Sequence, residues 1–127
     1  MQESTNKALI DRYLAAYNRS DIEGMVAVLA PELRFENYSG GQLTAGTTGI
    51  GEFRKLAEQS KALFAEREQR ITGQVNQGET LVADIAFKGR LAQDIPDGPP
   101  AGTILELSGT SEFSFSDGLI VKVVDRS

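Results

Sequence analysis

Apolar residues near the N-terminus recur at helical spacing and then lead, through a short corner, into an alternating strand pattern. The first apolar stripe consists of Leu9, Ile10, Tyr13, Leu14 and Tyr17. It predicts a helix that ends near residues 18–19. Because an amphipathic helix must bury its apolar face against another element, helix, corner, short helix and strand in close succession favour an α+β fold.

The corner after the first helix carries capping signals. Ser20 and Glu23 stand three residues apart, which predicts a capping box at the start of a second helix. The inner face of that helix is predicted to consist of Ile22, Met25, Val26 and Leu29. Pro31 is expected to end it, because proline cannot continue a helical hydrogen-bond ladder.

The strand predicted at residues 33–37 ends on an informative polar residue. Leu33, Phe35 and Asn37 share one face, and the charged residues between them share the other. The apolar face should be the interior, which puts Asn37 at the inner end of a hydrophobic row. An amide there can orient a ligand carbonyl or a water molecule, because it both donates and accepts hydrogen bonds. The alternative is an asparagine that caps a turn at the strand end.

The remainder of the chain predicts one more helix and a series of strands. Residues 38–49 contain four glycines and predict a turn-rich linker. The stripe of the third helix consists of Ile50, Phe53, Leu56, Ala57, Leu63 and Phe64. Strands are predicted at residues 70–75, 81–88, 102–115 and 119–125, with a hairpin turn at residues 117–118. The proline-rich residues 95–102 predict an irregular loop.

This order predicts a single α+β domain over residues 1–127, with a curved, mostly antiparallel sheet whose concave side carries the helices. A chain of this length buries about two-thirds of the surface that its unfolded form exposes. A sheet covered on one face by helices leaves a cavity between the two layers, and such cavities are the usual binding sites for small molecules.

Composition restricts the chemistry. The net charge is −5 and the 13 basic residues are scattered, so neither nucleic acid nor a membrane surface is an expected partner. The absence of cysteine removes thiol nucleophiles and disulfides, and the absence of histidine removes the usual proton shuttle at neutral pH. No apolar run approaches 18 residues. We expect a cytoplasmic protein that uses no metal and no cofactor.

Three side chains are candidates for catalysis, and each has a plainer interpretation. Tyr13 is either a buried donor to a developing oxyanion or a core tyrosine of an amphipathic helix. Asp125 alternates with Val121 and Val123, so it is either a general base facing the cavity or a solvated residue at a frayed strand end. Asn37 would orient the ligand.

Further side chains are candidates for ligand contact. Asp84 is either a pocket acid or an exposed residue opposite the apolar face of its strand. Ser111 could bond a ligand, although no histidine exists to activate it as a nucleophile. The phenylalanines expected in the core or along the cavity are Phe35, Phe53, Phe64 and Phe113. Residues 66–70 alternate in charge and predict a solvated helix end.

Two segments carry a resemblance to a known family. DRYLAAYNRSDIEGMVAVLAPELRFEN at residues 11–37 and PDGPPAGTILELSGTSEFSFSDGLIVKVVD at residues 96–125 resemble the nuclear transport factor 2-like superfamily. The closest group is the SnoaL-like polyketide cyclases and ketosteroid isomerases. The resemblance implies a cystatin-like cone with one internal pocket, and it implies a homodimer.

The resemblance transfers only part of each known site. The oxyanion tyrosine of ketosteroid isomerase falls on Tyr13, its base on Asn37 and its second donor on Ser111. An amide cannot take a proton at neutral pH, so that base is missing. The acid to which the polyketide cyclases look, near Ser111, is missing too.

Limonene-epoxide hydrolase resembles the chain at Asn37 and Asp125, but its charged partners fall near Asp84 and Ala86 and its tyrosine on Phe35.

Two functions remain open at this point. The first is an enzyme that acts on a small, largely apolar carbonyl or epoxide compound as an isomerase, cyclase or hydrolase. Tyr13, Asn37 and Asp125 would then serve as donor, orienting group and base. The alternative is a module without catalysis that binds a small ligand or forms a homodimer.

Overall fold

The computed structural model describes residues 2–127. The helices are α1 (Gln2–Asn18), α2 (Ile22–Val26) and α3 (Ile50–Leu63). The strands are β1 (Leu29–Ser39), β2 (Gln42–Thr48), β3 (Phe64–Gln77), β4 (Thr80–Leu91), β5 (Ile104–Ser116) and β6 (Leu119–Arg126). No helix in this described part of the chain is long and apolar enough to cross a membrane.

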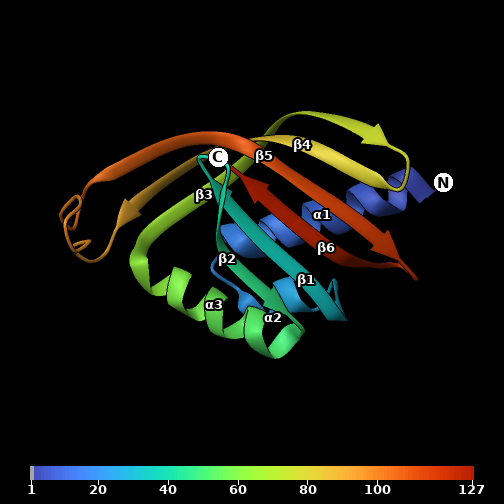
Figure 1. Ribbon diagram of the computed structural model, residues 1–127, viewed down its shortest axis with the longest axis horizontal. Helices are drawn as coiled ribbons and strands as arrows, with labels where there is room; N and C mark the ends of the chain where they lie inside the picture. Colours follow the sequence, from blue (N-terminus) through green and yellow to red (C-terminus); the bar gives the residue numbers. More distant parts are fainter. Residues whose placement is uncertain (1) are drawn as a thin grey trace.

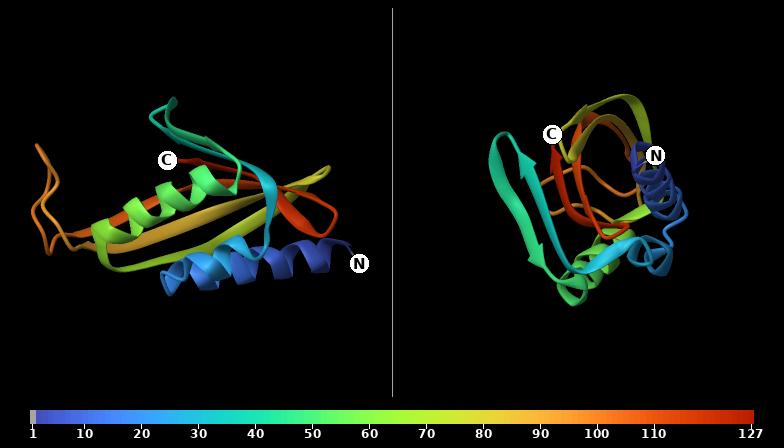
Figure 2. Two further views of the ribbon diagram at one scale, coloured as in Figure 1. Left: turned by 90° about the horizontal axis from the view of Figure 1, so that it is seen from below. Right: turned by 90° about the vertical axis from the view of Figure 1, so that its right-hand side faces the viewer.

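The six strands form one sheet in the order β2-β1-β6-β5-β4-β3, so β2 and β3 are the edge strands. β1 pairs with β6 in parallel, and all other neighbours pair antiparallel. The sheet curves strongly without closing (Figure 1). Seen end-on, α1 and α3 lie along its open side (Figure 2). The predicted α+β class, with a mostly antiparallel sheet curved against helices, is confirmed.

The helical stripe of the N-terminus is buried as its spacing predicts. Leu9, Ile10, Tyr13 and Leu14 of α1 all belong to the hydrophobic core. Tyr13 meets the ring of Phe113 on β5 edge-on, with the centroids 6.0 Å apart. Edge-to-face pairs of this kind favour one packing arrangement over others, since the positive ring edge points at the negative face. This contact fixes α1 across the middle of the sheet.

The corner between α1 and α2 differs from the predicted capping box. Asp21, not Ser20, caps α2, because its Oδ1 accepts a hydrogen bond from the backbone N–H of Gly24 at 3.0 Å. Ser20 lies in the left-handed region with φ 57° and belongs to the turn itself. Glu23 forms an ion pair with Arg54 of α3 instead of reaching back. The helix also ends at Val26, well before the predicted proline stop.

The glycine-rich stretch predicted as a linker contains a strand. β2 pairs antiparallel with β1, and Ser39 stands opposite Gln42 across the turn. Gly40 and Gly41 form that turn with φ 60° and 82°, a conformation that glycine adopts without a steric cost. The glycines therefore end one strand and start the next. The prediction failed because composition alone does not separate a hairpin from a loop.

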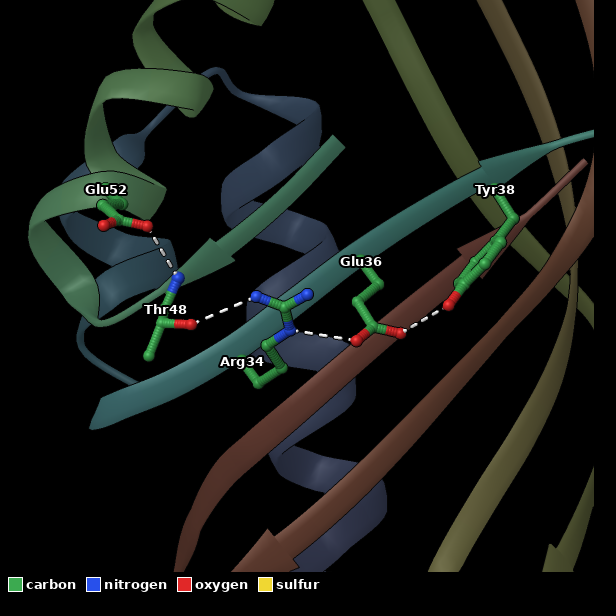
Figure 3. A network of polar contacts seen from close by, with 5 residues as sticks. All are labelled: Arg34, Glu36, Tyr38, Thr48 and Glu52. Atoms are coloured by element: carbon green, nitrogen blue, oxygen red, sulfur yellow. Dashed lines mark hydrogen bonds and ion pairs between the residues drawn. The ribbon is translucent and has the colours of Figure 1, made fainter. Parts of the chain in front are cut away.

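A polar network joins this hairpin to α3 (Figure 3). Arg34 donates from Nε to Glu36 at 2.9 Å and from Nη1 to the Thr48 hydroxyl at 3.1 Å. The Tyr38 hydroxyl donates to the other oxygen of Glu36 at 3.0 Å. The backbone N–H of Thr48 donates to Glu52 in the first turn of α3 at 2.9 Å. Arg34, Glu36 and Tyr38 occupy one face of β1, which leaves its other face free to line the interior.

The predicted solvated helix end at residues 66–70 is wrong. α3 ends at Leu63, and Phe64 already has extended dihedral angles of φ −118° and ψ 134°. The charged stretch belongs to β3, where side chains alternate between the two faces of the sheet. Arg67 is therefore buried while its neighbours Glu66 and Glu68 are exposed. By contrast, the predicted turn at residues 117–118 is present, with φ 54° and 77°.

Two glycines allow a matched test of the packing. A Cβ at Gly109 of β5 would overlap the backbone carbonyl oxygen of Arg126 on β6, whereas a Cβ at Gly51 of α3 would meet nothing within 4 Å. Gly109→Ala should lower the free energy of unfolding by about 2 kcal/mol or more, because neither backbone can move without breaking the ladder. Gly51→Ala should raise it by up to about 1 kcal/mol. Urea denaturation measures both, and an unchanged Gly109→Ala stability would contradict the close approach.

Candidate functional site

A pocket of about 470 Å³ lies between the concave face of the sheet and the helices. Most of its wall is apolar: Met25, Phe35, Phe53, Leu56, Ala57, Phe64, Ile85 and Phe87. Polar groups also reach it from α1, α3 and four strands, among them Tyr13, Tyr17, Asn37, Ser60, Arg67, Gln69, Ser111 and Asp125. An apolar pocket with a few convergent polar groups is the usual form of a small-molecule site.

Asp125 reaches the pocket from the central strand β6. It stands beside Asn37 in the parallel pairing and opposite Ser111 in the antiparallel pairing. The Ser111 hydroxyl donates to Asp125 Oδ1 at 2.6 Å. Burial raises the pKa of Asp125 from 3.8 to about 6, and the bond from Ser111 acts in the opposite direction. A carboxylate with such a pKa is largely ionised at neutral pH and is a better proton acceptor than an exposed one.

Tyr13 lines the same pocket from α1. Its side chain is 5% exposed, and burial raises its pKa well above the ordinary value of 10.0, with a further contribution from the charge of Asp125. The phenol therefore stays protonated at any ordinary pH. Within residues 2–127 its hydroxyl makes no hydrogen bond to the protein, so the O–H is available to a bound molecule.

Asn37 lies where its strand pattern predicts, on the inner face of β1 and in the pocket wall. Its amide nitrogen donates to the Thr44 hydroxyl of β2 at 2.8 Å, and that hydroxyl donates back to the Asn37 backbone carbonyl at 3.1 Å. These bonds fix the orientation of the amide. The side chain thus both anchors the hairpin and presents polar atoms next to Asp125.

The structure separates the other candidates. Phe35, Phe53 and Phe64 line the pocket, and Phe35 packs edge-on against Phe53 with ring centroids 5.7 Å apart. Phe113 is 1% exposed and lies in the core behind Tyr13 instead of in the pocket wall. Asp84 is exposed on the outer face of β4, because its neighbours on the strand point inward, and the pocket does not include it.

The sequence reasoning missed Arg67. Its guanidinium lies over the Tyr17 ring, 3.8 Å from the centroid, and its Nε donates to the Tyr17 backbone carbonyl at 3.3 Å. Nη1 donates to the Ser60 hydroxyl at 3.1 Å. Nearby, Asn18 and Gln69 exchange two hydrogen bonds that tie the end of α1 to β3. The available signal was a strand alternation at residues 64–69, which the charge pattern concealed.

No group of three or more histidine, cysteine, aspartate or glutamate side chains is gathered for a metal ion among the described residues. The polar groups of the pocket come from several elements and differ in chemistry: the carboxyl of Asp125, the guanidinium groups of Arg67 and Arg126, amides and hydroxyls. Such a set can exchange a proton at Asp125 and donate hydrogen bonds from Tyr13 and Arg67.

The curved open sheet with helices across its concave side defines a nuclear transport factor 2-like cone fold. The chain belongs to the SnoaL-like family, because the model of the SnoaL-like domain matches residues 10–123. The family resemblance seen in the sequence is confirmed.

Solved structures with the same fold include three from bacteria. TsrD from Streptomyces laurentii is 25% identical with a TM-score of 0.78, over 96% of this chain and 87% of TsrD. A candidate SnoaL-like polyketide cyclase from Jannaschia sp. CCS1 is 14% identical with a TM-score of 0.80, over 96% and 84%. AclR from Streptomyces galilaeus, a candidate hydroxylase, is 21% identical with a TM-score of 0.73, over 94% and 85%.

The raised pKa of Asp125 predicts a pH-dependent stability. Between the unfolded pKa of 3.8 and the folded pKa of about 6, the unfolded chain loses its proton first, so the contribution of this residue to stability falls as pH rises. Asp125→Asn removes that loss and keeps an oxygen for Ser111. From pH 4 to pH 7.5, the free energy of unfolding of the variant should rise relative to wild type by about 2 kcal/mol.

Urea denaturation across this pH range measures the difference. Every other carboxyl group is common to both proteins, so the difference isolates Asp125. Two curves that run parallel over the whole range would show that the carboxyl is not buried as described.

Proposed function

We propose that this protein is an enzyme that moves a proton on a small, largely apolar carbonyl compound, as an isomerase or a cyclase. Asp125 is the base and Tyr13 is the hydrogen-bond donor to the carbonyl oxygen. The observation that carries the proposal is the carboxyl of Asp125 in an apolar pocket, with a pKa raised to about 6 and with a protonated tyrosine in the same pocket.

The chemistry begins at a C–H bond next to a carbonyl group. The Asp125 carboxylate takes that proton, and the electron pair of the C–H bond delocalises onto the carbonyl oxygen. The Tyr13 hydroxyl donates a hydrogen bond to this oxygen as its charge grows, and such a preorganised donor is worth about 10²–10³ in rate. Because the pocket is largely apolar, both interactions are stronger than they would be in water.

The enolate has two outcomes that conserve atoms and protons. If protonated Asp125 returns its proton to a different carbon, the product is an isomer. If the enolate carbon attacks a second carbonyl of the same molecule, a ring closes and the new alkoxide takes the proton. The relative from Jannaschia sp. CCS1 is a candidate polyketide cyclase, which adds ring closure to the reactions to test. Asn37, held by Thr44 beside Asp125, would orient the reacting carbonyl.

The position of the base differs from that in ketosteroid isomerase. The base of that enzyme falls on Asn37 in this sequence, and here the carboxyl lies on the neighbouring strand β6, where Asp125 is the parallel partner of Asn37. A carboxyl at this register reaches the same pocket from one strand further into the sheet. The proposed reaction is therefore of the same class as that of ketosteroid isomerase, with the proton acceptor on β6 instead of β1.

Deuterium exchange tests the proposal without knowledge of the natural substrate. Probe ketones such as 2-tetralone and Δ5-3-ketosteroids, incubated in D₂O, should gain deuterium next to the carbonyl faster with the protein than without it. Asp125→Asn should lower this exchange by about 100-fold or more, the usual contribution of a general base. Tyr13→Phe should lower it by about 10²-fold. Mass spectrometry measures the incorporation.

Asp84→Asn is the matched control, since this carboxyl is exposed on the outer face of the sheet. It should keep wild-type exchange. Bound probes that gain no deuterium in the presence of wild-type protein would instead identify a binding protein without catalysis, and exchange that survives Asp125→Asn would remove Asp125 as the base.

The exchange rate should also depend on pH in one direction. Asp125 accepts a proton only when ionised, so kcat/KM for exchange should rise through about pH 6 and then level off. A stopped-time mass-spectrometric assay between pH 4.5 and pH 8 measures the profile. A rate that is flat across this range would assign the proton transfer to another group.

A further inference from the structure

Arg67 is a buried cation with one side unoccupied. Its residue is 6% exposed and it lies in the pocket wall on β3. Nη2 is buried and has no hydrogen-bond partner, while Nε and Nη1 are used by the Tyr17 carbonyl and Ser60. Among the ion pairs of the described residues none involves Arg67, so no carboxylate lies within 4.0 Å of it.

Such an arrangement is costly unless something completes it. Buried charges in proteins are normally paired, because removing an ion from water costs several kcal/mol. The cation–π contact with the Tyr17 ring offsets part of this desolvation cost. The remaining N–H groups still lack an acceptor, and a buried donor without a partner is rare in native structures. Nη2 of the guanidinium thus lacks the acceptor that a buried charge normally has.

We infer that Arg67 binds a carboxylate group carried by an otherwise apolar ligand of this pocket. The planar guanidinium fork matches the two oxygens of a carboxylate, and the bond between them is charge-assisted. The inference rests on the proposed function only in taking this pocket as the ligand site, since Arg67 would bind the carboxylate whether or not Asp125 then removes a proton.

The charge of the pocket fits a singly charged group. Among the described residues, the other cation of the wall is Arg126, which is already paired with Glu112 at 2.8 Å and lies over the Tyr38 ring. The guanidinium of Arg67 can pair with one carboxylate of a ligand, since the carboxyl of the wall, Asp125, is held by Ser111 instead. A phosphate group, which carries more charge, would need a second cation free of a carboxylate partner, and the described residues of the wall do not offer one.

The position of Arg67 sets the geometry of the ligand. In the sheet register, Arg67 stands opposite Gly89 of β4, whereas Ser111, the partner of Asp125, stands opposite Ala83. Gly89 and Ala83 are six positions apart on β4, which separates the backbone positions of Arg67 and Ser111 by about 20 Å along the strands. The carboxylate and the reacting carbonyl therefore occupy different ends of an elongated ligand. Tyr13 and Tyr17 lie between these ends, close enough that the charges of Arg67 and Asp125 both shift the pKa values of the two tyrosines.

The test uses a pair of probes that differ only in charge. 2-Naphthoate and its methyl ester have the same ring system, and calorimetry measures the affinity of each. Wild-type protein should bind the carboxylate more tightly than the ester by about tenfold or more, as expected for a charge-assisted bond. Arg67→Met keeps the length of the apolar stem and should abolish that preference, with ester affinity unchanged or improved.

Arg70→Met is the matched control, because Arg70 is an exposed arginine on the same strand. It should keep the wild-type preference, which separates a local contact from a general effect of net charge. The Nε–H resonance of Arg67 in wild-type protein gives a measurement that needs no variant: 2-naphthoate should shift it and the ester should not.

Equal affinity of wild-type protein for the two probes, or a preference that survives Arg67→Met, would overturn the inference. Asp125→Asn separates it from the proposed catalysis. That variant should keep the preference for 2-naphthoate over its ester while deuterium exchange is lost, so either idea can fail alone.

Discussion

The parallel pairing of β1 with β6 is the constraint on which the rest of the structure depends. It places the last strand between the first strand and β5, so the centre of the sheet joins the two ends of the chain. The polar inner residues of both strands, Asn37 and Asp125, become direct neighbours only through this pairing. The strands on either side then curve away and leave the helices to cover the hollow (Figure 2). Loss of that register would leave an apolar pocket without its carboxyl.

Local patterns predicted the elements well where a periodic apolar stripe was strong. The stripe from Leu9 to Tyr17, the third helix and the Asp117-Gly118 turn all come from spacing and turn chemistry, which act over a few residues. The failures lie where two local signals compete. Ser20 and Asp21 are both good N-cap residues. In the structure Ser20 has a positive φ in the turn, and the side chain of Asp21 caps α2. Glycines suit a flexible linker as well as they suit the hairpin turn at Gly40 and Gly41.

The site was harder to predict than the fold, because the burial of a polar side chain depends on residues that are far away in the sequence. Asp84 and Asp125 look alike in their strands, yet one lies on the outer face and the other in the pocket. The alternation of Asp125 with Val123 left both a pocket position and a solvated strand end open, because its partner Ser111 comes from another strand. The burial of Arg67 was not predicted, because its neighbours in sequence are charged and its contact with Tyr17 depends on the packing of the first helix against β3.

Arg67 and Asp125 lie on strands that differ in how many hydrogen-bonded neighbours they have in the sheet. Asp125 belongs to β6, which has hydrogen-bonded neighbours on both sides, whereas Arg67 belongs to β3, an edge strand paired only with β4. Local opening begins where backbone hydrogen bonds are fewest, so the β3 side of the pocket yields before the β6 side does. One end of the cavity is thereby stiff and the other pliant. The two ends of a bound molecule therefore meet walls that differ in how readily they adjust to its shape.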